Sequence, residues 1–148
     1  MNTDPRLDLL QTKLMISALW IVVLFNMLFR DLHEFARTGF LEELIAMTSN
    51  GASISEGLLL GAAAFLQIPI TMIALTLVLK TRATWWANLI AAPVTLAMIV
   101  GNNLAPDLDD AFFVAVECAA LLLVMRVAWR RLRAPADASV LREPTALA

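Results

Sequence analysis

The chain has 148 residues, of which 60% are hydrophobic and 16% are charged, and its formal net charge is −2. Soluble domains are about 45–50% apolar, and a domain near 150 residues still leaves roughly a third of its unfolded surface in water. The composition therefore excludes an ordinary soluble domain and predicts a protein of the lipid bilayer. It offers no basic surface for nucleic acid, and the single cysteine excludes an internal disulfide and a cysteine-rich zinc site.

Long uncharged runs predict four membrane-spanning helices. A helix needs about 20 apolar residues to cross a hydrocarbon core of about 30 Å, and the runs 57–79 and 83–106 both exceed this length. The first run, 14–29, is shorter, but Lys13 and Arg30 beside it can extend their charged ends to the headgroups. We interpret it as a retained helix and not as a secretory signal peptide. The expected spans are 12–32, 56–79, 84–105 and 110–131.

The first helix is expected to begin at Asp4-Pro5, an N-cap followed by a proline at the first helical position. Gly39 is a candidate for its C-terminal end. The next segment, "FLEELIAM", places Leu41, Leu44 and Ile45 on one helix face with the two glutamates elsewhere, which predicts a short amphipathic helix. We expect this helix to lie along the outer membrane interface or to cover the end of the bundle.

The second helix begins with a capping signal and a strip of small residues. In "SISE", Ser53 stands three residues before Glu56, which predicts a capping box and makes Glu56 a cap and not a catalyst. Gly57, Gly61 and Ala64 then recur at helical spacing, a pattern that lets two helices approach closely. The strip could pack against another helix of the same chain or form the seam of a homodimer.

The last two spans complete the predicted fold. The connection "KTRATWW" is so short that the second and third helices must be antiparallel neighbours. We therefore predict an all-α fold, an antiparallel four-helix transmembrane bundle with a short amphipathic helix in the first external loop. Residues 1–134 form this one domain, and residues 135–148, which are polar and contain proline, are expected to be a disordered cytoplasmic tail.

Lysine and arginine concentrate on one side of this bundle. Cytoplasmic flanks and short loops hold an excess of these residues, while the opposite loops contain only Arg30 and Arg37 together with many carboxylates. Both termini are therefore predicted to be cytoplasmic. The residues on the basic side are Arg6, Lys13, Lys80, Arg82, Arg126, Arg130, Arg131, Arg133 and Arg142.

One carboxylate interrupts the last apolar run. An ionised Glu117 at this depth costs several kcal/mol (roughly 2–4) unless it finds a partner, so we expect it to face the bundle interior. Helix spacing brings Arg30 and Asn26 of the first span, and Asn102 and Asn103 at the end of the third, to the same outer half of the bundle. We expect Glu117 to pair with Arg30 directly or through these asparagines.

These residues suggest an outward-facing polar pocket that binds or transports a small molecule, lipid or ion. Glu117 would be its charged centre and Arg30 the counter-ion, with Gln67 of the second span among the binding residues. An alternative is a non-catalytic membrane scaffold or regulatory subunit, in which interhelical hydrogen bonds only hold the bundle together. Arg30 could also pair with Glu34, one turn away, and leave Glu117 alone.

An integral membrane enzyme is a third interpretation, placed after these two because the sequence indicates no cofactor and no catalytic residue. The serines and threonines have no histidine–carboxylate partner at a convincing spacing. The only histidine is His33, and a metal site that combines it with Asp31, Glu34 and the 107–110 loop is less plausible than a solvated loop histidine. We therefore assign no metal ligand.

Three stretches carry a resemblance to a known family: "LWIVVLFNMLFRDL", the long run from "GLLLGAAAFLQIPI" to "KTRATWWANLIAA", and "VECAALLLVMRVAWRR". Over roughly residues 10–131 the chain resembles a family of small bacterial four-span membrane proteins of unknown function. The most specific pieces are 57–64, 68–70 and 80–88. The resemblance implies a multi-pass protein of the bacterial inner (plasma) membrane, and it names no catalytic residue.

Overall fold

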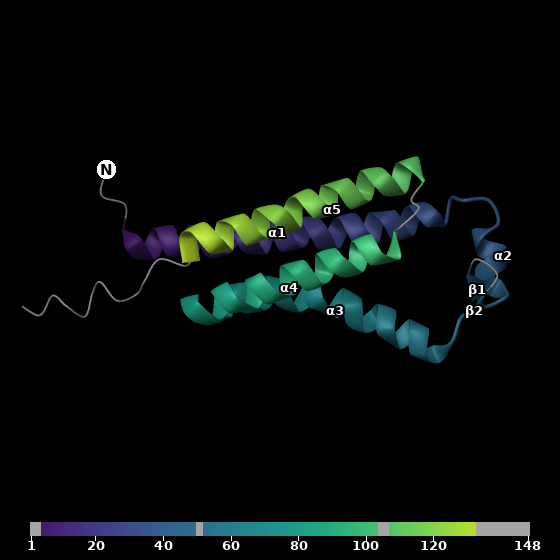
Figure 1. Cartoon of the computed structure of the whole chain (residues 1–148), viewed down its shortest axis with the longest axis horizontal. Coiled ribbons are helices and arrows are strands. Elements are labelled where there is room, and N and C mark those ends of the chain that lie inside the picture. Colours follow the sequence, from purple (N-terminus) through teal and green to yellow (C-terminus); the bar gives the residue numbers. More distant parts are fainter. Residues whose placement is uncertain (1–3, 50–51, 104–106, 133–148) are drawn as a thin grey trace, which may run out of the picture.

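The computed structural model describes residues 4–49, 52–103 and 107–132, and the predicted tail at 135–148 lies outside these ranges. Four long helices pack together (Figure 1). They are α1 (Pro5–Glu34), α3 (Glu56–Val78), α4 (Thr81–Asn102) and α5 (Leu108–Val127), and α5 continues as a π-helix, η1 (Ala128–Leu132). A short helix, α2 (Phe40–Ile45), and an antiparallel hairpin of β1 (Thr48–Ser49) and β2 (Ala52–Ser53) join α1 to α3. The predicted all-α bundle is confirmed.

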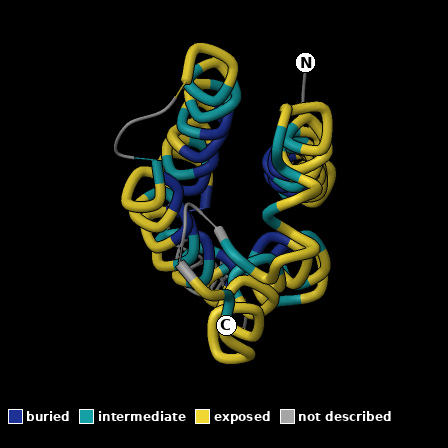
Figure 2. Tube along the Cα trace, turned by 90° about the vertical axis from the view of Figure 1, so that its right-hand side faces the viewer, coloured by how far each residue is buried: buried dark blue, intermediate teal, exposed yellow. Residues whose placement is uncertain are grey.

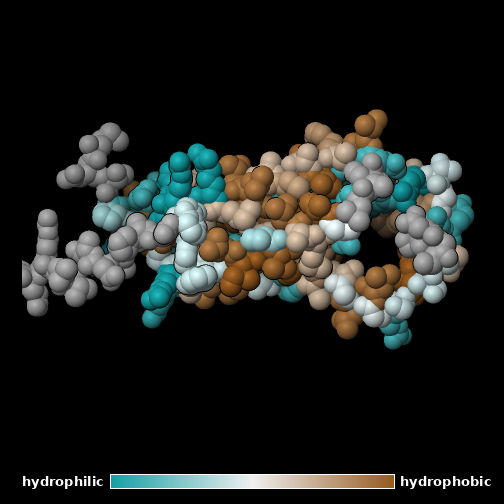
Figure 3. All heavy atoms as spheres, viewed as in Figure 1, coloured by the Kyte–Doolittle hydropathy of each residue, from teal (hydrophilic) through white to brown (hydrophobic). Residues whose placement is uncertain are grey.

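The four long helices have the length and composition of membrane spans. Each is apolar enough over an 18-residue window to cross a bilayer, within the stretches Pro5–Glu34, Glu56–Val78, Thr81–Asn102 and Leu108–Leu132. Figure 3 shows hydrophobic residues over the middle of the visible face and hydrophilic residues toward both ends. The chain is therefore a multi-pass membrane protein.

The helices form a closed ring in the order α1, α3, α4, α5, with α5 again beside α1. Buried residues gather on the inner sides of the helices (Figure 2). On α1 the buried apolar residues are Ile16, Trp20, Val23 and Met27, at spacings of four, three and four, which is the stripe expected for one buried helix face. Arg30 stands at the next position of the same stripe, so the core pattern itself directs Arg30 inward.

The two ends of the bundle differ in charge. We call the end with Asp31, Glu34, Asp109 and Asp110 the acidic end, and the opposite end with Lys13, Lys80, Arg126, Arg130 and Arg131 the basic end. At the acidic end His33 Nε2 lies 3.1 Å from Asp109 Oδ2, which connects α1 to α5. At the basic end the Lys13 ammonium donates to the carbonyl oxygens of Leu77 and Leu79, the last carbonyls of α3.

Two helix ends differ from the expected ones. The N-cap of α3 is Ser55, whose Oγ accepts a 3.2 Å hydrogen bond from the amide of Leu58, so the predicted capping box from Ser53 is wrong. Ser53 is instead the last residue of β2, two residues before the N-cap. The N-cap at Asp4, by contrast, is confirmed by a 2.9 Å bond from the amide of Arg6.

Gly39 does not end the first helix. Helix α1 ends at Glu34, and Gly39, with a φ of 88°, is the N-cap residue directly before α2. A left-handed conformation of this kind is easily adopted only by glycine. Glycine therefore serves here to turn the chain into the next helix and not to cap the previous one.

Helix α3 leaves the bundle toward the acidic end. Every residue from 55 to 64 is exposed, whereas Pro69, Met72 and Thr76 in the other half are buried. Figure 1 shows this exposed half turned away from the other long helices, with α2 and the hairpin beyond it. Proline lacks the amide donor that would continue the helix ladder, so Pro69 is a position where a helix can bend.

Candidate functional site

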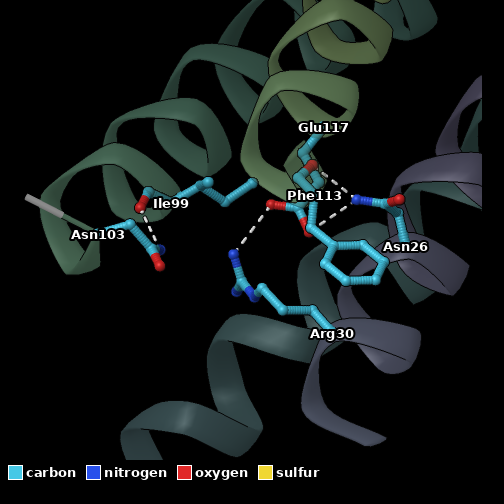
Figure 4. A network of polar contacts seen from close by, with 6 residues as sticks. All are labelled: Asn26, Arg30, Ile99, Asn103, Phe113 and Glu117. Atoms are coloured by element: carbon cyan, nitrogen blue, oxygen red, sulfur yellow. Dashed lines mark hydrogen bonds and ion pairs between the residues drawn. The ribbon is translucent and has the colours of Figure 1, made fainter. Parts of the chain in front are cut away.

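A cluster of polar side chains joins α1 to α5 in the half of the bundle nearer the acidic end. Glu117 of α5 has no exposed surface, as predicted from the cost of a carboxylate in lipid. Its Oε2 lies 3.3 Å from Arg30 Nη1, and its Oε1 accepts a 3.2 Å hydrogen bond from Asn26 Nδ2 (Figure 4). Both carboxylate oxygens therefore have a partner on α1.

Asn26 holds the two helices together at this point. Its Nδ2 also donates a 2.8 Å hydrogen bond to the backbone carbonyl of Phe113, one turn before Glu117. Because Asn26 and Arg30 are four residues apart, both reach the same stretch of α5. Glu117 faces inward because it shares a face of α5 with buried Leu121 and Val124.

Arg30 is only partly satisfied. A guanidinium has five N–H donors, yet the contact with Glu117 is its one polar contact within the described part of the chain. At 3.3 Å this contact is longer than the 2.7–2.9 Å usual for charge-assisted hydrogen bonds. The side chain is 14% exposed, and in Figure 4 its guanidinium lies at the middle of the cluster, between Glu117 and Asn103. Further acceptors can therefore reach it.

The alternative pairing of Arg30 with Glu34 does not occur. Glu34 is paired with Arg37, whose Nη2 lies 2.8 Å from Glu34 Oε2 at the surface of the acidic end. This leaves Arg30 free for the buried carboxylate.

Three other predicted binding residues do not contact Glu117. Asn103 of the α4 end donates from Nδ2 to the carbonyl of Ile99 at 2.7 Å, as a cap of its own helix. Asn102 is exposed at the last residue of α4, where its helix end is not covered by a neighbouring helix. Gln67 is exposed on α3, where it lines a separate groove.

The strip of small residues has no neighbour within the described chain. Gly57, Gly61 and Ala64 are all exposed. A methyl group added at Gly61 would meet nothing within 4 Å, and one at Gly57 would meet only the side chain of Ser55 at 3.9 Å. The alternative in which this strip packs against another helix of the same chain is therefore wrong, because this half of α3 stands apart from the bundle.

A second polar network, in the half nearer the basic end, was not predicted. Trp20 Nε1 donates a 2.7 Å bond to Asn88 Oδ1, and Asn88 Nδ2 bonds to Thr76 Oγ1 at 3.3 Å and to the carbonyl of Thr84 at 2.8 Å. All four residues are fully buried. In the sequence, the seven-residue spacing of Asn88 and Thr95 indicates a polar face on α4. It does not indicate which neighbouring helices Asn88 contacts. With every group of Asn88 paired, this network holds α1, α3 and α4 together.

Thr95 is buried without a hydrogen-bond partner. Its Oγ1 has no partner among the described residues, although the residue has no exposed surface. It stands seven residues beyond Asn88 on the same buried face of α4, toward the acidic end. The Thr95 hydroxyl is therefore a polar group in the interior that makes no hydrogen bond to the described residues, and Arg30 likewise has donors that no described residue accepts.

The acidic end contains the residues of the metal site that was weighed against a solvated histidine. A cavity of about 370 Å³ lies at the acidic end and is lined by His33, Glu34, Arg37, Asp107 and Asp109. Across the described ranges no three His, Cys, Asp or Glu side chains stand close enough to share an ion. The contact of His33 with Asp109 is half exposed and belongs to the surface that joins α1 to α5.

The fold and the cluster define an integral membrane protein with four apolar helices and a buried Glu–Arg pair in its interior. Residues 9–134 match the model of DUF6326, a family of unknown function, and the chain belongs to this family. The resemblance found in the sequence is thereby confirmed. No curated protein and no solved structure matches the chain.

Proposed function

We propose that this protein binds or transports a small polar molecule, a lipid headgroup or an ion at the cluster of Asn26, Arg30 and Glu117. The observation that carries the proposal is the incomplete pairing of Arg30 beside a fully buried carboxylate. Only 14% of the Arg30 side chain is exposed, and a ligand would supply acceptors for the guanidinium donors that Glu117 does not engage. The cluster offers a positive donor and a negative acceptor 3.3 Å apart, which suits ligands with groups of both kinds.

The position of α3 supports access from the acidic end. Residues 55–64 leave the bundle, so this half of α3 does not cover the interior as the other half does. The excess of lysine and arginine at the basic end supports an orientation with that end, and both termini, in the cytoplasm. In this orientation the cluster lies in the outer half of the bundle.

We propose a binding or transport role and not an enzymatic one. The cluster contains one carboxylate, one guanidinium and one amide, and its acceptor and donor atoms already engage each other. Such a set can recognise and orient a charged group, whereas nucleophilic catalysis needs an activated nucleophile beside a base.

The proposal is tested by ligand-dependent thermal unfolding in lipid nanodiscs. Wild-type protein is screened with sodium, inorganic phosphate, a primary amine, a zwitterionic amino acid and a bacterial lipid extract, and we expect at least one to raise the melting temperature. Arg30→Gln and Glu117→Gln should each abolish that shift. Arg37→Gln is the matched control, because it removes an arginine paired at the surface, and it should keep the shift. A shift that survives both cluster variants would place the ligand elsewhere.

A membrane scaffold or regulatory subunit is the second candidate. It is favoured by α2, which has no buried residue and exposes 84% of Ile45 and 51% of Leu41. Exposed aliphatic side chains beside Glu42 and Glu43 can contact a partner or the membrane interface. If the protein is a scaffold, binding of its partner would depend on α2 and on Gly57 and Gly61, and not on Glu117.

A further inference from the structure

One face of α3 carries polar and small residues that no described helix covers. Gly57, Gly61, Ala64 and Thr71 recur at spacings of four, three and seven, so they share a face, and Gln67 borders it. All five are exposed. A groove of about 330 Å³ runs along this face and is lined by Ala64, Gln67, Ile68, Thr71 and Met72.

Gln67 is the feature of this face that requires a partner. It stands eleven residues from Glu56 and eleven from Val78, the two ends of α3, which places it about 16 Å from either end at 1.5 Å per residue. This is the middle of the hydrocarbon layer. Its amide has two N–H donors and one carbonyl acceptor, and the described chain provides no hydrogen bond to them. Acyl chains provide none either, so an uncovered Gln67 is unfavourable in a membrane.

We propose that a second copy of this chain covers this face and that the Gln67 amides of the two copies hydrogen-bond to each other. The strong bias of lysine and arginine toward the basic end favours one orientation for every copy of this chain, so a two-fold axis along the membrane normal brings identical residues together at equal depth. The glutamine amide is both donor and acceptor, and it therefore complements itself across such an axis. Gly57, Gly61 and Ala64 let the two α3 helices approach closely.

The groove fits a second helix better than it fits a ligand of the Glu117 cluster. It is lined by residues of α3 alone, whereas Glu117 is buried between α5 and α1. The dimer therefore does not rest on the proposed ligand site, and either can be present without the other. Gln67, which was predicted from the sequence to be a binding residue, is part of the dimer seam.

Disulfide crosslinking in vesicles tests this proposal. Ala64→Cys is made in a Cys118→Ala background, which removes the native thiol, and the purified protein is reconstituted at high dilution into vesicles of bacterial lipid and oxidised. We expect a crosslinked dimer as the main product. Val94→Cys is the matched control, because Val94 is 44% exposed and lies thirteen residues from the start of α4 at the basic end, close to the fourteen residues between Ala64 and the end of α3, and it should give a monomer. Equal yields from the two positions, or no dimer from Ala64→Cys, would overturn the proposal.

A second variant tests the role of Gln67 itself. Gln67→Leu in the Ala64→Cys background removes the amide pair but keeps an apolar, helix-compatible side chain, so the bundle should still fold. Interhelical hydrogen bonds in membranes contribute about 0.6–2 kcal/mol each, and we expect the association constant to fall about tenfold. Gln67→Asn, which keeps an amide, should retain more of the dimer than Gln67→Leu. If Gln67→Leu dimerises as well as the parent, the amide pair is refuted. A ligand-induced shift in melting temperature should be unchanged in this variant.

Discussion

At the scale of single residues, Glu117 and Arg30 decide what the interior of this bundle can do. Removing one partner of a buried ion pair leaves the other charge without compensation, at a cost of about 3–5 kcal/mol in proteins. Glu117 has no exposed surface, while Arg30 retains 14%. The carboxylate thus depends on the protein for its partners, whereas the guanidinium can still reach a ligand or water.

The coupling between these two residues can be measured with a double-mutant cycle. Arg30→Met, Glu117→Leu and the double variant are unfolded with denaturant in bicelles, and we expect a coupling free energy of about 1–3 kcal/mol, because each single variant strands the partner in the interior. The pair Glu34 and Arg37 is the control. It is 24% and 47% exposed and should show a coupling below about 1 kcal/mol. Equal couplings for the two pairs would contradict the buried role of Glu117.

At the scale of helices, the polar residues of α4 serve different purposes along one stripe. Asn88 and Thr84 are buried and hydrogen-bonded in the half nearer the basic end, Thr95 is buried without a partner, and Asn102 is exposed at the helix end. The same residue type thus contributes to stability at one position and not at another. What differs is whether a neighbouring helix is close enough to supply a partner.

Asn88→Leu is predicted to destabilise the bundle much more than Asn102→Leu. Replacement of Asn88 leaves the indole N–H of Trp20 buried without an acceptor, which costs about 1–3 kcal/mol. Replacement of exposed Asn102 should change the free energy of unfolding by less than about 0.5 kcal/mol. Both values can be read from denaturant unfolding followed by Trp fluorescence. Similar losses for the two variants would show that the Trp20–Asn88 bond contributes little.

At the scale of the whole molecule, the difference in charge between the two ends sets the expected orientation. Four antiparallel helices bring residue 5 and residue 132 to the same end, where Arg130 and Arg131 also lie. The positive charges predict that this end remains in the cytoplasm. The polar cluster and α2 would then lie toward the outside.

Cysteine labelling in intact cells checks this orientation. In a Cys118→Ala background, Ala36→Cys at the acidic end should react with a membrane-impermeant maleimide in intact spheroplasts. Ala83→Cys at the start of α4 should react only after the membrane is permeabilised. Both positions are exposed, so a difference in reactivity reports the side of the membrane. The reverse pattern would invert the proposed topology.

Much of this architecture was predictable from the sequence because lipid imposes strong and local requirements. A spanning helix must satisfy its own backbone and must be apolar over about 20 residues, so four spans were evident in the pattern of charges. The inward position of Glu117 was predictable from the free-energy cost of exposing a carboxylate to lipid. The cap at Asp4 followed from local chemistry alone, whereas the cap at Ser55 did not, because the hairpin before it takes up Ser53.

The sequence by itself determined the class of protein, the number of spans and the burial of Glu117, since each depends on the chain and its solvent alone. Only the tertiary structure decided which residues meet. Of the two partners that the sequence left open for Arg30, it selected Glu117 and paired Glu34 with Arg37, and it joined Trp20 to Asn88. It also set Gln67 and the small residues of α3 apart from the bundle. Which residues meet depends on the distance between neighbouring helices. The spacing of residues along one helix does not give that distance.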